Sequence, residues 1–371
     1  MQTDAAVLWE PGTEWKIERI ELDPPKEGEV LVRLAASGMC HSEEHVVTGD
    51  APMPLPMVGG HEGAGVVEEI GPGVRDLAPG DHVVSSFLPA CGRCPSCSTG
   101  HQNLCDLGAF IADGWQISDG TARHHLGDVD LRVMCMLGTF AHRTVGSESS
   151  FVKIDPDVPL DLAALLGCGF TTGWGSAVYR ADVQPGEDVV VVGVGGLGAA
   201  AVQGARMAGA RRIFAVEPQV EKWDAARLFG ATHTVGSLED AFGLIQQETQ
   251  GRMCHKLVAT MGVGRGELVA SLMALVAKRG RAVMTNVHNA AEIDVKMSMI
   301  DLVFLEKEVV GCLYGSANPR SDIPRLAQLY KEGRIDLDGM VTRRYPLDGI
   351  NEGYEDMRNG RNIRGVLVYP D

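Results

Sequence analysis

Nine cysteines are present, and four of them crowd between Cys91 and Cys105. Their spacing, Cys91-x2-Cys94-x2-Cys97-x7-Cys105, suits a tetrahedral tetrathiolate zinc site. Four thiolates fill every coordination position and leave none for a substrate, so this zinc would be structural. An iron–sulfur cluster is the main rival, because four cysteines also hold such clusters. Disulfides and a nucleic-acid-binding zinc module are less favoured.

Three further potential metal ligands are scattered along the chain. Cys40 lies in Gly-Met-Cys-His-Ser-Glu-Glu-His, His61 in Gly-Gly-His-Glu-Gly-Ala-Gly and Cys168 in Leu-Leu-Gly-Cys-Gly-Phe. Two thiolates and one imidazole would leave the fourth zinc position open for water or an alcohol oxygen, as catalysis requires. Spacing alone does not establish this grouping, because each residue taken singly is more often a buried cysteine or a hydrogen-bonded core histidine.

A glycine-rich motif follows an apolar run in the second half of the chain. Val189–Val192 leads into Gly193-Val-Gly195-Gly-Leu-Gly198, and an alanine-rich helical stretch comes next. In this setting the first glycine makes a tight turn, the second admits a pyrophosphate, and the third lets helix and strand pack closely. The helix N-terminus offers free N–H groups to phosphates. The motif therefore predicts a dinucleotide site, although a glycine-rich turn alone would be weak support.

An acidic residue ends the next predicted strand and indicates which dinucleotide is bound. Glu217 follows Ile213–Val216. A carboxylate there can accept hydrogen bonds from both ribose hydroxyls of NAD. It would repel the extra phosphate of NADP by roughly 1–4 kcal/mol per charge pair. We therefore predict NAD as the cofactor.

The elements that must position these residues change character along the chain. The first 150 residues have short valine-rich strands, such as Val30–Leu34 and Gly65–Ile70, separated by turns. From Val189 onward, short apolar runs alternate with helical stretches, which predicts a parallel, doubly wound sheet in an α/β protein. These stretches are Val189–Val192, Leu197–Met207, Ile213–Val216, Lys222–Phe229, Leu257–Thr260, Leu268–Ala277 and Ala282–Thr285.

Length and charge limit the possible functions. A chain of 371 residues favours two domains. The formal net charge is −16, which opposes binding to nucleic acid or to an anionic membrane surface. Neither a signal peptide nor an apolar run long enough to span a bilayer is evident, so we expect a cytoplasmic protein.

With these motifs in this order, the chain resembles the zinc-containing medium-chain alcohol dehydrogenases. The matching stretches are Gly38–His45, Gly59–Gly65, the four-cysteine lobe, Leu165–Gly173 and the Gly193 loop. The resemblance implies a GroES-like, β-rich catalytic domain built from both ends of the chain around a Rossmann domain. The implied bounds are residues 1–169 and 314–371 for the catalytic domain, with a structural-zinc lobe at 91–105, and 170–313 for the NAD-binding domain.

The resemblance also implies roles for individual residues. Cys40, His61 and Cys168 would hold a catalytic zinc, with Glu62 behind it. Ser42 would take the alcohol proton, and His45 would pass it outward through the cofactor ribose. Residues implied to bind the cofactor are His41, Thr172, Gly193, Gly195, Gly196, Leu197, Gly198, Glu217, Lys222 and Arg364.

At two positions this sequence departs from its relatives, and at others a surface or core role is the alternative to a role in the site. His41 stands where many relatives carry arginine against the pyrophosphate, which weakens that contact. Glu43 stands where an aspartate often supports the zinc-bound imidazole, which adds one methylene of reach. Lys222 and Arg364 would otherwise be solvated surface charges. Residues expected to line the substrate pocket, or else to belong to the core, are Phe87, Phe110, Met136 and Leu137.

Within the family, the chain is most similar to the nitrosodimethylaniline-dependent nicotinoprotein alcohol dehydrogenases of actinobacteria. This narrower match rests on Gly100–Gly108, Phe214–Pro218, Phe229–His233 and Asn362–Val366. It implies NAD that stays bound and is reoxidised in place, with mycofactocin as the electron carrier.

The resulting expectation is a reversible oxidation of a small alcohol to an aldehyde or ketone by hydride transfer to NAD. Two zinc ions per chain and a homo-oligomer are expected. Alternatives are an ordinary dehydrogenase with exchangeable NAD, a thiol-dependent formaldehyde dehydrogenase, and a non-catalytic NAD-binding protein. The last is disfavoured because Cys40, Ser42 and His61 are all present.

Overall fold

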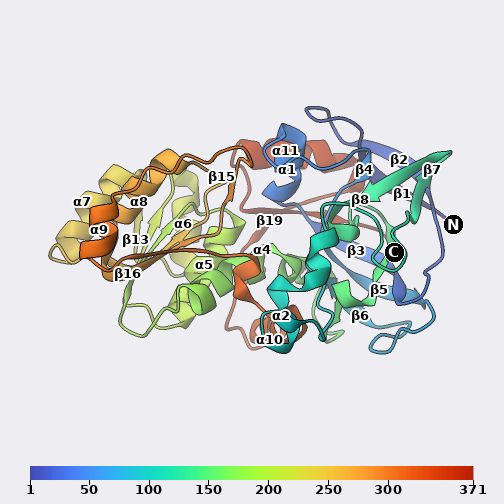
Figure 1. Ribbon diagram of the computed structural model, residues 1–371, viewed down its shortest axis with the longest axis horizontal. Coiled ribbons are helices and arrows are strands. Elements are labelled where there is room, and N and C mark those ends of the chain that lie inside the picture. The colour runs from blue at the N-terminus through green and yellow to red at the C-terminus, as the bar shows by residue number, and fades with distance from the viewer. Residues whose placement is uncertain (371) are drawn as a thin grey trace. The chain divides into compact units, whose positions relative to one another are not determined.

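The computed structural model describes residues 1–370, and the chain forms two compact units (Figure 1). Residues 1–168 and the C-terminal segment from Asn318 make the first unit, and residues 169–317 make the second. The blue-to-green start and the red end of the chain in Figure 1 therefore belong to one unit.

The first unit contains a small closed barrel and a seven-stranded sheet. The barrel, in spatial order, is β1 (Gln2–Leu8), β2 (Lys16–Leu22), β7 (His124–Leu126), β8 (Val129–Val133) and β4 (Met57–Val58). The sheet, in spatial order, is β10 (Phe151–Lys153), β6 (His82–Ser85), β5 (Glu62–Ile70), β3 (Glu29–Gly38), β20 (Arg364–Val368) and β19 (Val341–Tyr345), and β9 (Arg143–Ser147) also pairs with β3.

Strand β3 is the centre of this unit. Its apolar residues are buried along most of its length, as expected for a strand covered on both faces. It pairs antiparallel with β5, so both predicted valine-rich strands are present and adjacent. It also pairs with β20, where Val366 lies opposite Gly38, so the end of the chain does fold back onto the first unit.

The helices of the first unit are short. Helix α1 (His41–Thr48) starts three residues after β3 ends, and Gly49 closes it in the left-handed conformation that favours glycine. The others are α2 (Pro95–Ser98), α3 (Leu160–Ala163), α10 (Pro319–Lys331) and α11 (Ile350–Arg358), with 3-10 turns that include η2 (Asp106–Phe110), η3 (Met134–Met136) and η5 (Ala164–Gly167).

The second unit is built on the predicted doubly wound sheet. Its strands, in spatial order, are β13 (His233–Val235), β12 (Arg212–Val216), β11 (Asp188–Val192), β14 (Cys254–Ala259), β16 (Val276–Met284) and β18 (Glu308–Gly311). All neighbouring strands are parallel. The order reverses between β11 and β14, and open sheets of this kind bind ligands beyond the carboxyl ends of the strands at such a point.

Helix α4 (Gly169–Gly175) precedes the first strand of this sheet, and the other α-helices of the unit lie between its strands along the chain. These are α5 (Gly196–Met207), α6 (Trp223–Phe229), α7 (Leu238–Glu248), α8 (Val269–Ala274) and α9 (Met299–Phe304), and β15 (Val263–Gly264) pairs with β17 (Val287–His288). The predicted helix over Leu268–Ala277 is too long. The backbone is already in β16 from Val276, because valine and alanine there complete the buried strand.

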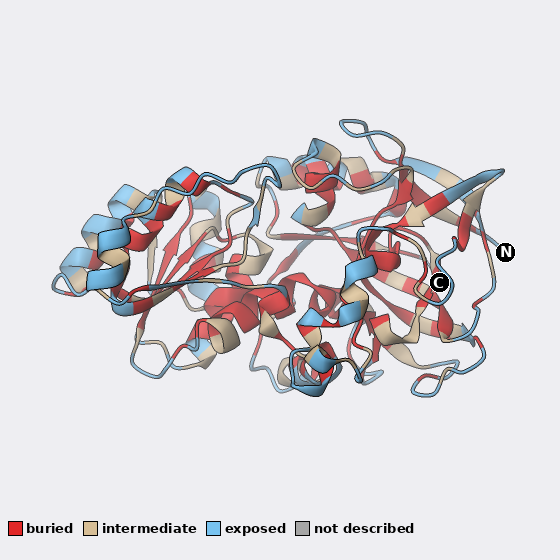
Figure 2. Cartoon of the chain, viewed as in Figure 1, coloured by how far each residue is buried: buried red, intermediate tan, exposed pale blue. Residues whose placement is uncertain are grey.

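Each unit has its own apolar core, and the strands of both are mostly buried (Figure 2). The five residues of β11 are all buried, as expected for a central parallel strand. Within residues 1–370, no helix combines the length and apolar character needed to cross a membrane.

Candidate functional site

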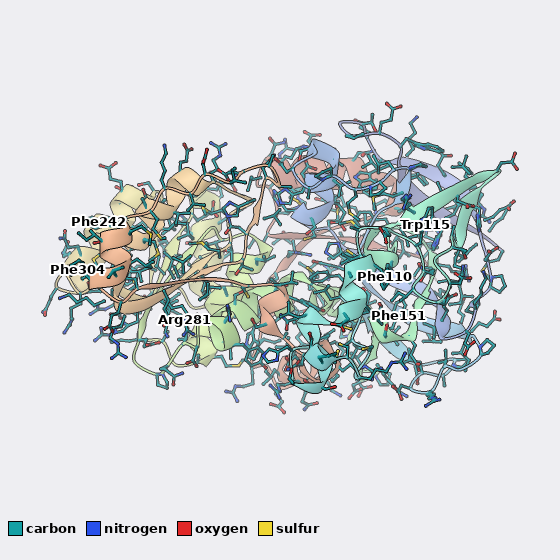
Figure 3. All side chains as sticks on the ribbon, viewed as in Figure 1. Phe110, Trp115, Phe151, Phe242, Arg281 and Phe304 are labelled. Atoms are coloured by element: carbon teal, nitrogen blue, oxygen red, sulfur yellow. The ribbon has the colours of Figure 1, made fainter. Side chains whose placement is uncertain are left out.

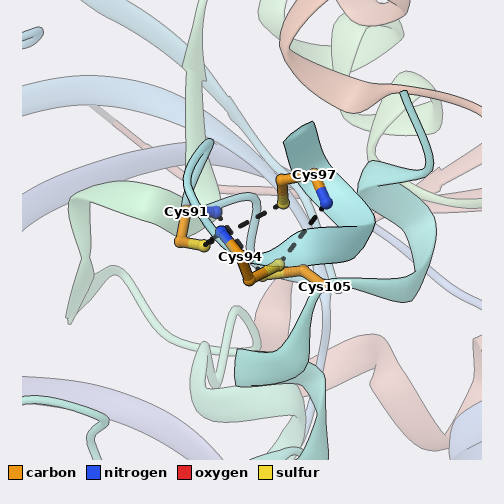
Figure 4. A group of neighbouring side chains, drawn as sticks. All are labelled: Cys91, Cys94, Cys97 and Cys105. Carbon is orange, nitrogen blue, oxygen red and sulfur yellow. Dashed lines mark hydrogen bonds between the residues drawn. The ribbon is translucent and has the colours of Figure 1, made fainter. Parts of the chain in front are cut away.

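The four-cysteine lobe brings its four sulfurs together (Figure 4). The Sγ atoms of Cys91 and Cys97 are 4.0 Å apart, and those of Cys94 and Cys105 are 3.9 Å apart. Tetrahedral zinc with Zn–S bonds near 2.3 Å separates its sulfurs by about 3.8 Å, so the observed spacing fits. A disulfide would need an S–S distance of about 2 Å.

The backbone of the lobe turns its N–H groups toward the sulfurs. Cys94 N–H points at Cys91 Sγ (3.4 Å), and Cys97 N–H points at Cys94 Sγ (3.4 Å). Asp106 N–H also reaches Cys94 Sγ (3.5 Å). The N–H groups of Asp106 and Cys97 lower the pKa of Cys94 to about 7. Such donors favour the thiolate form that a metal requires.

The scattered candidates also meet, although they come from three separate segments. Ligand atoms of Cys40, His61, Glu62 and Cys168 all lie within 4.8 Å of one another, and all four residues are buried. Cys40 precedes helix α1, His61 precedes strand β5, and Cys168 follows η5. Two thiolates and an imidazole form the donor set of a zinc site with an open position.

Charged residues surround this cluster. Glu43 Oε1 lies 2.5 Å from His61 Nδ1, with both side chains buried. This bond leaves Nε2 of His61 as the nitrogen that can bind a metal. On the other side, the guanidinium of Arg364 pairs with the carboxylate of Glu62. Glutamate is one methylene longer than the aspartate that relatives often carry at this position, and the carboxylate of Glu43 still contacts the imidazole of His61 directly.

The electrostatics of the cluster reflect many acids in a small buried space. Burial raises the pKa of Glu62 to about 7, although Arg364 opposes that shift. The hydrogen bond with Cys168 and the adjacent His61 hold the pKa of Cys40 well below its usual range against the effect of burial. Burial disfavours a charged His61, but Glu43 and Cys168 outweigh burial and raise its pKa well above the usual range. The group that fits such a site is a cation.

Helix α1 carries the residues predicted to move a proton. Ser42 Oγ lies 3.4 Å from Cys40 Sγ. His45 is buried one turn further along, with Nδ1 3.7 Å from Asp50 Oδ2. His41 is exposed, and its ring centroid lies 5.9 Å from that of His45. One short helix thus places a hydroxyl and an imidazole beside the candidate metal site.

The four predicted pocket residues occupy different surroundings. Phe87 packs edge-on against the His61 ring, with centroids 5.7 Å apart. Met136 and Leu137 are completely buried. Phe110 is 47% exposed (Figure 3) and lies in η2, directly after the four-cysteine lobe. Phe87 therefore directly contacts a candidate metal ligand.

In the second unit, the glycine loop has the geometry that its sequence predicts. Gly193 has a φ of +89° and turns the chain out of β11. A side chain at Gly195 would meet no atom within 4 Å, so this backbone is open to a ligand. A side chain at Gly198 would collide with the carbonyl oxygen of Gly193. Helix α5 begins at Gly196, so its first N–H groups lie at the loop.

Glu217 lies at the carboxyl end of β12, beside this loop. Its Oε2 accepts a hydrogen bond from Val194 N–H (2.8 Å), and its Oε1 accepts one from Gln219 N–H (3.0 Å). Each carboxylate oxygen retains a lone pair for a ribose hydroxyl. Lys222 is half-buried nearby, where burial lowers its pKa although Glu217 opposes that shift. Thr172 lies buried in α4 of the same unit.

One ion pair beside the site was not predicted. Arg358 on α11 contacts both carboxylate oxygens of Glu44 on α1, each at 3.1 Å. It ties the C-terminal segment to the helix that carries Ser42 and His45. The partners are 314 positions apart in the chain, so no local pattern could reveal the pair.

Comparison with known proteins settles the family. Residues 26–156 match the model for the alcohol dehydrogenase GroES-like domain, and residues 196–332 match the model for zinc-binding dehydrogenases. Alcohol dehydrogenase B of Mycobacterium tuberculosis is 48% identical over 100% of this chain and 99% of its own length. The chain belongs to the zinc-containing alcohol dehydrogenase family.

Further relatives agree with this assignment. The NDMA-dependent alcohol dehydrogenase of Amycolatopsis methanolica is 47% identical over 100% of this chain and 99% of its own. Crystal structures of an alcohol dehydrogenase zinc-binding domain protein from Burkholderia ambifaria (TM-score 0.93, 32% identity) and of benzyl alcohol dehydrogenase from Acinetobacter calcoaceticus (TM-score 0.91, 29% identity) each align over 100% of both chains. The predicted fold, a GroES-like domain with a Rossmann domain, is confirmed. The protein is a zinc-containing, NAD-dependent alcohol dehydrogenase that acts on small-molecule alcohols.

Proposed function

We propose that each chain holds two zinc ions with different tasks. The four-cysteine lobe would bind a structural zinc, and Cys40, His61 and Cys168 would bind a catalytic one. The observation that carries this proposal is the convergence of three buried ligands beside Glu62, all within 4.8 Å of one another. Metal analysis of the purified protein tests it, with about two zinc ions per chain expected. Iron, or a ratio near one at full activity, would contradict it.

The residues around the catalytic zinc would divide the work of alcohol oxidation. When bound, zinc supplies a Lewis acid that lowers the pKa of a coordinated hydroxyl group. Glu43 holds the imidazole of His61 in one orientation and one tautomer. Glu62 lies behind the ligands, and its pairing with Arg364 keeps this carboxylate beside them. The chain thereby fixes the ligand geometry before the substrate arrives.

Ser42 and His45 would carry the alcohol proton away. The hydroxyl of Ser42 lies beside Cys40, where an alcohol in the open position would be within reach. His45 would receive the proton through the cofactor ribose and release it toward Asp50 and solvent. Removing the proton would leave the negative charge on the alcohol oxygen, which favours loss of a hydride from the adjacent carbon. The nicotinamide, when bound, would supply the redox chemistry.

The second unit would act as the NAD-binding domain. The exposed backbone at Gly195 and the start of α5 suit the pyrophosphate, and Glu217 suits the adenosine ribose. His41, Lys222 and Arg364 are proposed as further cofactor contacts, although Arg364 already pairs with Glu62. Affinity measurements on reconstituted apoprotein should favour NAD over NADP, and equal affinities would contradict the role of Glu217.

We further propose that NAD stays bound through many turnovers. The support is similarity to the alcohol dehydrogenase of Amycolatopsis methanolica, which is NDMA-dependent. A second substrate, or a carrier of the mycofactocin type, would then reoxidise NADH in place. The test is alcohol oxidation by extensively dialysed enzyme with nitrosodimethylaniline and no added NAD. Strict dependence on added NAD, with free NADH accumulating, would indicate an ordinary dehydrogenase, and strict thiol dependence a formaldehyde dehydrogenase.

A second copy of this chain is the proposed protein partner. Strand β18 ends the six-stranded sheet, and the preceding helix α9 exposes a run of apolar side chains. Phe304, which is labelled in Figure 3, is 79% exposed, and Ile300 is 67% exposed. Two identical edge strands can pair about a twofold axis and cover such a face. Light scattering should give a dimer or larger assembly, and Phe304→Glu should shift it toward monomer.

A further inference from the structure

Two buried polar atoms beside the candidate catalytic zinc lack a formed hydrogen bond. Glu43 uses Oε1 for His61, but its Oε2 has no partner among the described residues. The hydroxyl of Tyr354, on helix α11, is also buried and also lacks a partner there. Leaving a buried carboxylate oxygen and a buried phenol unpaired is unfavourable, so both atoms call for an explanation.

Helices α11 and α1, which carry Tyr354 and Glu43, are in contact through the ion pair of Arg358 with Glu44 (3.1 Å), so these two groups lie in neighbouring elements. Burial and then the charge of Glu43 raise the pKa of Tyr354 well above its usual range, and a contact between the two side chains contributes to the shift. The phenol is therefore protonated at neutral pH. Because the carboxylate can only accept a hydrogen bond, the phenol must be the donor between the two groups.

The phenol ring is fixed in place by its neighbours. It stacks on Trp15, with centroids 6.3 Å apart and an interplanar angle of 25°, and it meets Phe140 at 6.3 Å. Tyr354 is only 2% exposed. Such packing limits the motion of the ring and leaves the hydroxyl direction nearly constant. The ring of Tyr354 is held by aromatic packing, and its hydroxyl is the polar end that can orient the carboxylate of Glu43.

We propose that Tyr354 donates its hydroxyl hydrogen to Glu43 Oε2 and thereby positions Glu43 against the zinc ligand His61. The chain of contacts runs from Tyr354 through Glu43 to His61. The extra methylene of glutamate gives its carboxylate more freedom than an aspartate would have, and the phenol removes that freedom. Tyr354 is thus a positioning residue that acts through Glu43. This inference rests on the proposed catalytic zinc at Cys40, His61 and Cys168.

The main test compares Tyr354→Phe with Tyr345→Phe. Tyr345 is a matched control because it is also a buried tyrosine in the same core, and its hydroxyl donates to Asp356 (2.7 Å), which the proposal does not involve. Zinc release to a chromogenic chelator is measured, and the catalytic ion is the one whose release coincides with loss of alcohol oxidation. Tyr354→Phe should release that ion about tenfold faster, as losses of such supporting bonds do. Tyr345→Phe should match the unmodified protein.

A double-mutant cycle with Glu43→Ala then separates positioning from simple packing. If Tyr354 acts through Glu43, removing its hydroxyl changes the zinc release rate only while Glu43 is present. Equal effects in both backgrounds, or equal release by Tyr354→Phe and Tyr345→Phe, would overturn the inference. If Glu43→Ala does not fold, Glu43→Gln takes its place in the cycle. A single zinc per chain in the unmodified protein would instead contradict the proposed catalytic site itself.

Discussion

The two candidate zinc sites of the first unit are built in opposite ways. The lobe takes four cysteines from one short segment, and two of them are only partly buried. Its sulfurs receive backbone N–H groups from within the same segment. The second site takes Cys40, His61 and Cys168 from three segments and buries them all. Its neighbours include the charged side chains of Glu43 and Arg364.

This difference separates a site that stabilises from a site that reacts. A closed tetrathiolate set needs only a local loop, and metal binding then contributes to folding. A site with an open position needs a rigid scaffold that keeps the remaining ligands apart and excludes water.

Replacing Cys40 with alanine should have the largest effect on activity. Alcohol oxidation should fall below detection and zinc should fall from about two to about one per chain, because the open site loses a ligand. The melting temperature should change little. Activity and metal content measured on the same preparation check this outcome. The control is Cys254→Ala, a buried cysteine in β14 of the other unit, which should keep both metals and most activity.

Replacing Cys97 with alanine should act on folding first. Its thiol belongs to the closed set, so losing it removes a metal that holds the lobe together. A fall in melting temperature of roughly 5 °C or more is expected, with activity lost in proportion to folded protein. Calorimetry checks it, with the exposed Ser98→Ala as control. A stable Cys97→Ala protein that lacks only turnover would reverse the assigned roles of the two sites.

Ser42→Ala should leave both metals and the fold intact while slowing the reaction. Loss of a proton-transfer group costs about a hundredfold or more in kcat. Ser42→Thr keeps the hydroxyl and should recover most of the rate. Steady-state kinetics with metal analysis test this. An unchanged kcat in Ser42→Ala would show that the proton leaves by another path.

The smallest effect is expected at the two phenylalanines nearest the two sites. Phe87 packs on His61, whereas Phe110 follows the lobe and is 47% exposed. Phe87→Ala should change kcat/KM by about tenfold, because a small shift near the reacting atoms is costly. Phe110→Ala should change it by less than about twofold, as is usual for exposed side chains. Equal effects would mean that Phe110 also lines the substrate site.

Much of the fold could be predicted from the sequence. The apolar runs at 189–192 and 213–216 became β11 and β12, since continuous apolar stretches of that length suit buried parallel strands. The predicted helix over Leu268–Ala277 was wrong in extent, because periodicity does not distinguish a buried helix end from the start of a buried strand. The barrel order could not be predicted, because pairs such as β2 with β7 join distant segments.

By itself, the sequence determined the four-cysteine lobe and the glycine loop. In both, the chemistry depends on residues a few positions apart, so chain geometry alone brings them together. Only the tertiary structure decided the surroundings of the second zinc site. It placed Glu43 on His61, Arg364 on Glu62, and Arg358 on Glu44. These contacts depend on how α1, β20 and α11 pack, and packing is set by the whole buried core rather than by any local spacing.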